Sequence, residues 1–169
     1  AHFEEFGWLV STYSFRPNDA FAIESLRTGL SEKNITAVAI AGASQNIGDD
    51  AEALDELLQS NVFMPLAIAA LCKELSPATR IIHFGSSWQL DIDGRRDPFN
   101  LYAATKTAAE EALRHYANQG LEIVSLRLFD TYGSGDTRKK LINLIVQTIK
   151  NGDRLQTTEG IQEFGLMHI

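Results

Sequence analysis

The sequence contains very little cysteine, since Cys72 is the only one among 169 residues. A single thiol excludes a disulfide framework within the chain, and its place in the apolar run 66–72 predicts a buried side chain, which fits a reducing cytosol. No apolar run approaches the roughly 18 residues that a membrane span needs, and no basic start with an apolar core suggests a signal peptide. We therefore expect a soluble, cytoplasmic protein with no membrane partner.

Basic residues are also scarce: 15 lysines and arginines stand against 22 acidic residues and give a formal charge of −7. The sequence pI is about 5.0. Because lysine and arginine form no stripe beyond short clusters such as 138–140, a partner made of nucleic acid is not expected. The composition, 44% hydrophobic and 22% charged, is typical of a globular domain with a sizeable core.

Short apolar strands alternate with longer helical segments along the chain. The expected strands are 35–41, 80–84 and 122–128, and the expected helices between them are 51–75 and 101–118. This alternation predicts a parallel sheet with right-handed crossovers, a Rossmann-type doubly wound α/β fold. Residues 8–14 are a candidate for one more strand, with a helix over 20–30 leading to the first buried strand.

The pattern loosens after Gly133. A helix is expected over 138–150, followed by strand-like pieces around Leu155 and Phe164. The expected division is a Rossmann-type unit over 1–133 and the beginning of a substrate-covering region over 134–169. The chain has no initiating Met and stops within an expected strand, which indicates a fragment.

Tyr102 and Lys106 stand four residues apart in an expected helix, so both lie on one helix face. A tyrosine with a pKa of about 10 is nearly all protonated at neutral pH, so work as a general base requires a nearby cation that favours the phenolate. Lys106 is placed to supply that charge. Because this spacing often arises by chance, a solvated helix face is the alternative, and neighbouring motifs must decide.

Residues that follow strands are the next candidates, because ligands of open α/β sheets bind beyond the carboxyl ends of the strands. The small residues at 41–42 would let a ligand approach the backbone closely. Ser86 and Ser87 place two hydroxyls at a strand end, where one could bind a substrate oxygen beside Tyr102. The third strand end is 129–133. An ordinary turn is the alternative at each of these places.

Pro65 lies inside the helix expected over 51–75. Proline has no amide hydrogen, so the carbonyl of Asn61 loses its usual partner at a cost of about 3 kcal/mol unless something compensates. A freed carbonyl can hold a water molecule, and with Lys106 such a water would form a proton path from Tyr102 to solvent. A simple helix kink is the alternative.

Together these motifs resemble a known family. Ser86, Tyr102 and Lys106 occur in that order, preceded by Asn61 in a helix and by residues 41–42 at a strand end. This combination is similar to the extended short-chain dehydrogenase/reductases, the NAD-dependent epimerase/dehydratase group that acts on nucleotide sugars.

The resemblance covers nearly the whole chain. Residues 127–133 are similar to the family's Arg-x-Phe-Asn-x-Tyr-Gly segment, and residues 162–168 resemble the strand before its late substrate-site loop. Segments 85–89, 100–106 and 128–133 look most like the CDP-abequose and paratose synthase branch, which reduces 4-keto sugars.

The resemblance implies hydride transfer at a sugar carbon, with NAD or NADP as the cofactor. Tyr102 would give or take the hydroxyl proton, and Ser86 would hold that oxygen, with Ser87 as the alternative. Lys106 would lower the pKa of the tyrosine and bind the nicotinamide ribose. Asn61 would support the water relay.

The resemblance also implies the remaining contacts. The cofactor would lie against Ala41, Gly42, Tyr102, Lys106, Phe129, Asp130 and Thr131. The substrate, a nucleotide sugar, would lie against Ser86, Ser87, Trp88 and Arg138. No metal is expected, and relatives suggest a homodimer in which the two long helices pair across a two-fold axis.

Two features depart from the family pattern. The Gly-x-x-Gly-x-x-Gly fingerprint that seats the cofactor pyrophosphate would lie upstream of residue 1, so the Rossmann unit is expected to lack its first βαβ portion. The acidic pair that 4,6-dehydratases carry is replaced by Ser87 and Trp88, which disfavours dehydration.

The sequence therefore predicts an NAD(P)-dependent nucleotide-sugar oxidoreductase, either a 4-keto reductase or an epimerase. A non-catalytic relative that senses nucleotides or serves as an interaction protein is one alternative. A reductase of small non-nucleotide carbonyls is another.

Overall fold

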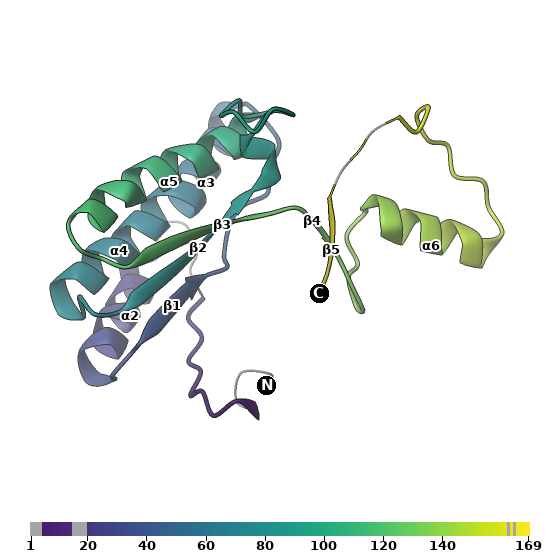
Figure 1. Ribbon diagram of the computed structural model, residues 1–169. Helices are drawn as coiled ribbons and strands as arrows, with labels where there is room; N and C mark the ends of the chain where they lie inside the picture. The colour runs from purple at the N-terminus through teal and green to yellow at the C-terminus, as the bar shows by residue number, and fades with distance from the viewer. Residues whose placement is uncertain (1–4, 15–19, 162, 164) are drawn as a thin grey trace. The chain divides into compact units, whose positions relative to one another are not determined.

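The computed structural model describes residues 5–14, 20–161, 163 and 165–169. The chain forms two compact units, one up to Leu126 and one from Arg127 on, and Figure 1 shows the elements of each. This division falls before the boundary expected after Gly133, so the segment 129–133 belongs to the second unit.

A three-stranded sheet runs through the first unit. Strand β2 (Arg80–Ser86) lies between β1 (Ala37–Ile40) and β3 (Ile123–Leu128). Strands β1 and β2 are parallel, with Val38 opposite Ile81. The expected α/β fold with a parallel sheet is therefore confirmed, and β2 continues two residues beyond its expected end.

Four helices accompany this sheet. They are α2 (Ala20–Glu32), α3 (Ala51–Leu57), α4 (Met64–Leu75) and α5 (Leu101–Asn118). Figure 1 shows α3, α4 and α5 on one side of the sheet. A π-helical segment, Leu58–Phe63, joins α3 to α4, so the helix expected over 51–75 is present with one stretch of wider turns. The side chain of Asn100 caps α5 by accepting a hydrogen bond of 3.0 Å from the Ala103 amide.

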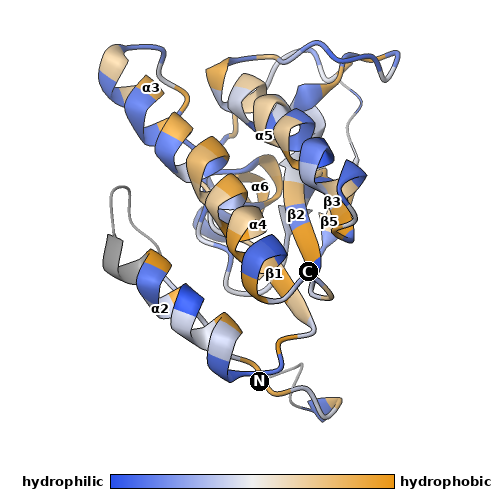
Figure 2. Cartoon of the chain, turned by 90° about the vertical axis from the view of Figure 1, so that its left-hand side faces the viewer, coloured by the Kyte–Doolittle hydropathy of each residue, from blue (hydrophilic) through white to orange (hydrophobic). Residues whose placement is uncertain are grey.

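Apolar side chains from these helices and from the sheet form the core of the first unit. Figure 2 shows hydrophobic residues along α4, α5 and β2. The buried members include Leu26, Leu30, Ile68, Cys72, Ile81, Leu113 and Leu121. Burying one large apolar side chain contributes about 1.5–3 kcal/mol. Cys72 is buried, as expected, and burial raises the pKa of its thiol to about 11.

The second unit contains a parallel strand pair and one helix. Strand β4 (Asp130–Tyr132) pairs with β5 (Leu166–His168), and helix α6 spans Leu141–Asn151. Gly152, with a φ of +72°, ends α6 in the left-handed conformation that glycine tolerates best. None of the side chains of α6 is buried.

Two expected strands are wrong. Residues 8–14 and the segment around Leu155 have no regular secondary structure, because neither pairs with a strand in the described part of the chain. The position of Phe164 lies outside the described residues.

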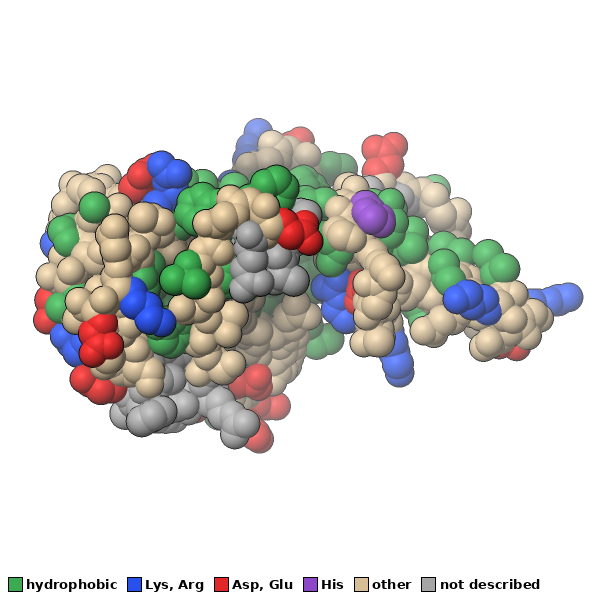
Figure 3. Space-filling model, turned by 90° about the horizontal axis from the view of Figure 1, so that it is seen from below, with side chains coloured by type: hydrophobic (Ala, Val, Ile, Leu, Met, Phe, Trp, Pro, Cys, Tyr) green, Lys and Arg blue, Asp and Glu red, His purple; other side chains and the backbone are tan. Residues whose placement is uncertain are grey.

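Within the part of the chain that the structure describes, no helix is long and apolar enough to span a membrane. Figure 3 shows acidic and basic side chains interspersed over the face that it draws.

Candidate active site

Lys106 is a buried cation on α5, one helical turn after Tyr102. Lys106 is 4% exposed, and its Nζ donates a hydrogen bond of 2.9 Å to the carbonyl of Phe84 in β2. Burial lowers the pKa of Lys106 to about 8, so the ammonium stays largely protonated at neutral pH. Buried lysines with shifted pKa values are concentrated at functional sites.

Tyr102 is half-buried at the start of α5, and its ring stands against Trp88 in the turn that follows Ser86. Burial raises the pKa of Tyr102, and hydrogen bonding with the Ser86 side chain lowers it in part. The sequence predicted that Lys106 lowers the pKa of Tyr102, but the Lys106 ammonium is bonded to the carbonyl of Phe84. Ser86 is the last residue of β2, and the hydrogen bond to Phe84 holds Lys106 of α5 at the same end of that strand.

The turn after β2 fixes the backbone of Ser86. The hydroxyl of Ser86 accepts a hydrogen bond of 3.3 Å from the Trp88 amide, and Oε1 of Gln89 accepts one of 2.7 Å from the Ser86 amide. These reciprocal bonds form a capping box. Trp88 also stands edge-on to Tyr102, with 6.2 Å between the ring centroids. Of the two candidate serines, Ser86 is the one whose side chain acts on the pKa of Tyr102.

Asn61 lies in the π-helical segment and is fully buried. Its Oδ1 accepts from the Ser44 amide at 3.0 Å, and its Nδ2 donates to the Ser44 carbonyl at 3.1 Å and to Thr105 Oγ1 at 3.3 Å. Thr105 in turn donates to the carbonyl of Tyr102. The Asn61 side chain therefore joins the loop after β1 to the start of α5. The predicted water relay concerns the main-chain carbonyl of Asn61 and stays a prediction.

The loop after β1 is open at Ala41 and Gly42, which are both exposed. A Cβ atom placed at Gly42 would meet no atom within 4 Å, so the backbone here borders space that a ligand can enter. Further along, the Ser44 hydroxyl donates to Glu56 at 2.6 Å, which helps to lower the pKa of that carboxyl. The loop is thus held at Ser44 and open at Gly42.

The other candidate residues belong to the second unit. Arg138 donates to both carboxylate oxygens of Asp136 at 2.7 Å and to Thr131 Oγ1 at 2.9 Å. The guanidinium holds the pKa of Asp136 well below its usual range. Lys140 forms an ion pair with Asp130. The arginine predicted to bind substrate is therefore engaged within its own unit, as are two of the residues predicted to bind cofactor.

A cavity of about 250 Å³ opens in the second unit. Its lining consists of Asp130, Thr131, Tyr132, Lys140, Leu141, Ile142 and Leu166. Phe129, the residue before β4, is 53% exposed.

Several buried or half-buried polar residues lie near the site that the sequence motifs did not single out. Glu110 follows Lys106 by four residues on α5, a helical spacing that could have singled it out. Gln89 had only the weak Ser-x-x-Gln signal of a capping box. Thr105 and His83, both buried, had no sequence signal.

A parallel α/β sheet with serine, tyrosine and lysine gathered at the end of its middle strand defines a Rossmann-type domain of the short-chain dehydrogenase/reductase class. More particularly, the chain belongs to the NAD dependent epimerase/dehydratase family, whose sequence pattern matches residues 11–169. The chain is similar to CDP-abequose synthase from Yersinia pseudotuberculosis, with 26% identity over 114 residues, which cover 67% of this chain and 40% of that protein.

Solved structures share the fold. A double mutant of dTDP-glucose 4,6-dehydratase from Streptomyces venezuelae with NAD bound matches with a TM-score of 0.71 at 18% identity, over 86% of this chain and 48% of that one. UDP-glucuronic acid 4-epimerase from Bacillus cereus, in complex with UDP-glucuronic acid and NAD, matches with a TM-score of 0.68 at 17% identity. The match covers 92% of this chain and 59% of that one. The chain therefore spans between 40% and 59% of the length of these relatives.

Proposed function

We propose that this chain carries the proton-transfer site of an NAD(P)-dependent nucleotide-sugar oxidoreductase, a 4-keto reductase or an epimerase. The supporting observations are that the Ser86 side chain acts on the pKa of the half-buried Tyr102, and that the buried Lys106, one helical turn further along α5, is bonded to Phe84 in β2. Family membership and the nucleotide sugars bound or processed by the relatives support the substrate class. Bound NAD(P) would supply or accept the hydride.

In this proposal Tyr102 takes the hydroxyl proton when a sugar alcohol is oxidised and returns it when the ketone is reduced. Ser86 holds the same oxygen by a hydrogen bond, so that both groups act on one substrate atom. Lys106 adds the positive charge that favours the phenolate during transfer. Asn61 supports this arrangement by holding the start of α5 and, through its carbonyl, the proposed water relay.

The residues present fit part of a nicotinamide cofactor. Gly42 borders open space beyond β1, where ligands of parallel α/β sheets bind. Lys106 has three N–H donors, and one is used by Phe84, so two remain for ribose hydroxyls. The proposed cofactor contacts are Ala41, Gly42, Tyr102, Lys106, Phe129, Asp130 and Thr131.

The proposed substrate contacts rest on the resemblance to the family and on the exposure of Trp88. Trp88 is partly exposed beside the tyrosine, so its ring offers an apolar surface to a sugar. Neither Ser87 nor Trp88 carries a carboxyl, so elimination of water is disfavoured. The proposed substrate contacts are Ser86, Ser87, Trp88 and Arg138. A homodimer formed through the long helices is proposed by analogy with relatives.

Tyr102→Phe in the full-length enzyme tests the proposal. Turnover of CDP-, UDP- or dTDP-linked sugars should fall by at least about 100-fold, because the proton-transfer group is removed, while cofactor binding persists. Tyr116→Phe, on the same helix but outside the site, is the matched control and should leave turnover unchanged. Substantial turnover by Tyr102→Phe would contradict the proposal. A wild-type enzyme that binds cofactor but turns over none of these sugars would favour the non-catalytic alternative.

A further inference from the structure

Gln89 connects the serine turn to helix α5. Its side chain belongs to a residue that is 1% exposed. Its Oε1 accepts a hydrogen bond of 2.7 Å from the Ser86 amide, and its Nε2 donates one of 2.9 Å to Oε2 of Glu110. A peptide N–H can only donate and an ionised carboxylate can only accept, so a single orientation of the amide satisfies both partners.

Glu110 fixes the other end of this connection. It follows Tyr102 by eight residues and Lys106 by four, so all three side chains lie on one face of α5. Its second carboxylate oxygen, Oε1, accepts a hydrogen bond of 3.4 Å from Nη2 of Arg96, and the side chain of Glu110 is 15% exposed. A hydrogen bond to a carboxylate at such a shielded position is stronger than one between neutral groups.

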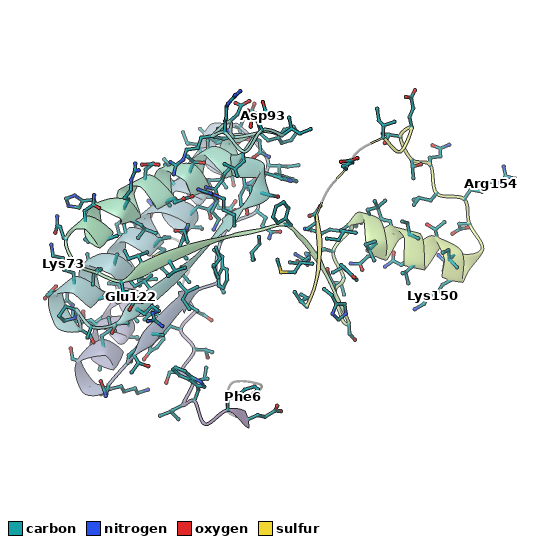
Figure 4. All side chains as sticks on the ribbon, in the orientation of Figure 1. Phe6, Lys73, Asp93, Glu122, Lys150 and Arg154 are labelled. Carbon is teal, nitrogen blue, oxygen red and sulfur yellow. The ribbon has the colours of Figure 1, made fainter. Side chains whose placement is uncertain are left out.

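Arg96 extends the connection to the loop 90–99. It also pairs with Glu111, and its backbone forms an antiparallel bridge with Leu90. Figure 4 labels Asp93 near the tip of this loop, which projects beyond the start of α5. The exposed loop is therefore held, through Arg96, to the same helix that carries Glu110.

We infer that Gln89 and Glu110 are positioning residues that set the distance between Ser86 and Tyr102, an inference that rests on the proposed function. Two clamps join β2 and its turn to α5: one from Lys106 to Phe84, before the serine, and one from Gln89 to Glu110, after it. A displacement of about 1 Å at a reacting group can cost about 100-fold in rate. The second clamp therefore supports turnover without touching the substrate.

An exchange of the two side chains tests this inference in the full-length enzyme. Gln89→Glu sets two carboxylates against each other and should lower kcat about 100-fold, with the KM for cofactor changed less than about threefold. Gln89→Glu combined with Glu110→Gln exchanges amide and carboxylate but keeps both hydrogen bonds, so kcat should recover to within about tenfold of wild type. Glu111→Gln is the matched control, because Glu111 also pairs with Arg96, and it should keep kcat within about twofold.

Wild-type kcat in Gln89→Glu would overturn the inference, as would a double variant no more active than Gln89→Glu. If Gln89→Glu does not fold, Glu110→Gln alone carries the test with an expected loss of kcat of about tenfold, and an unchanged kcat would refute the inference. Tyr102→Phe separates the two proposals. If it is inactive while Gln89→Glu is fully active, only the positioning role fails, and if it is active, the proposed function itself fails.

Discussion

The first unit surrounds its reactive groups with partners, whereas the second unit leaves its apolar helix in solvent. Asn61, Gln89 and Lys106 are almost fully buried, and each is hydrogen-bonded to groups within the first unit. In the second unit α6 buries none of its side chains, and Ile149 is 74% exposed. The geometry of the serine, tyrosine and lysine is therefore set by contacts among residues up to Leu126.

The basic residues proposed for the site are held differently in the two units as well. Lys106 holds a buried charge against a backbone carbonyl, at the expense of a lowered pKa. The basic residues Arg138 and Lys140 instead pair with Asp136 and Asp130, acidic residues nearby in the sequence, at partly exposed positions. Substitutions in the first unit should therefore separate activity from stability, and substitutions in α6 should affect neither strongly.

Lys106→Met should give the largest effect and the sharpest separation. Turnover should fall about 1000-fold, because the charge that favours the phenolate is lost, and cofactor affinity should weaken. Burial lowers the pKa of Lys106 from 10.5 to about 8, so the folded state disfavours this charge, and methionine should keep or raise stability at neutral pH. Urea unfolding followed by tryptophan fluorescence measures this, since Trp8 and Trp88 both belong to the first unit.

Lys73→Met is the matched control, because Lys73 is an exposed lysine on α4. It should change neither turnover nor cofactor affinity. Unaltered cofactor affinity in Lys106→Met would count against a ribose contact. A large loss of stability would show that the buried ammonium holds the first unit together.

His83 provides a pH test of the first unit. Burial lowers its pKa to about 4, the Lys106 charge acts in the same direction, and Glu110 opposes them. As the pH falls from 6.5 to about 4, the unfolded chain binds a proton that the folded chain resists, so stability should decrease through this window. Tryptophan-monitored urea midpoints across that range should fall for the wild type and fall less for His83→Phe.

His115→Phe is the control for this titration, because His115 lies on the exposed side of α5. It should keep the wild-type slope. An equally steep slope in His83→Phe would assign the acid sensitivity of the first unit to another group.

Sequence patterns located the elements whose ends carry local signals. The helix over 101–118 was predicted with its observed bounds, and Gly120, with a φ of +98°, follows its end. The structure adds that Asn100 caps its start. The four-residue spacing placed Tyr102 and Lys106 on one face of that helix, and the rule that ligands bind beyond strand ends singled out Ser86.

Contacts between distant segments could not be predicted in the same way. Gln89 and Glu110 are 21 residues apart, and Asn61 and Thr105 are 44 apart, so no periodicity relates them. Pro65 signalled a change in its helix but not its π-helical form. Residues 8–14 were misassigned because strand formation depends on a partner strand that the local sequence does not specify.

The smallest change in stability is expected from Ile149→Ala, which forms a matched pair with Ile81→Ala. Ile81→Ala removes a fully buried side chain from β2 and should lower the free energy of unfolding by about 2–5 kcal/mol. Ile149→Ala removes the same atoms from an exposed position on α6, and alanine is the better helix former, so stability should change by no more than about 0.5 kcal/mol. Hydrogen exchange in residues 80–86 and 141–151 measures each unit separately. If Ile149→Ala reduced protection in 141–151 as strongly as Ile81→Ala reduces it in 80–86, α6 would have to bury its apolar face in solution, and the contrast between the two units would be lost.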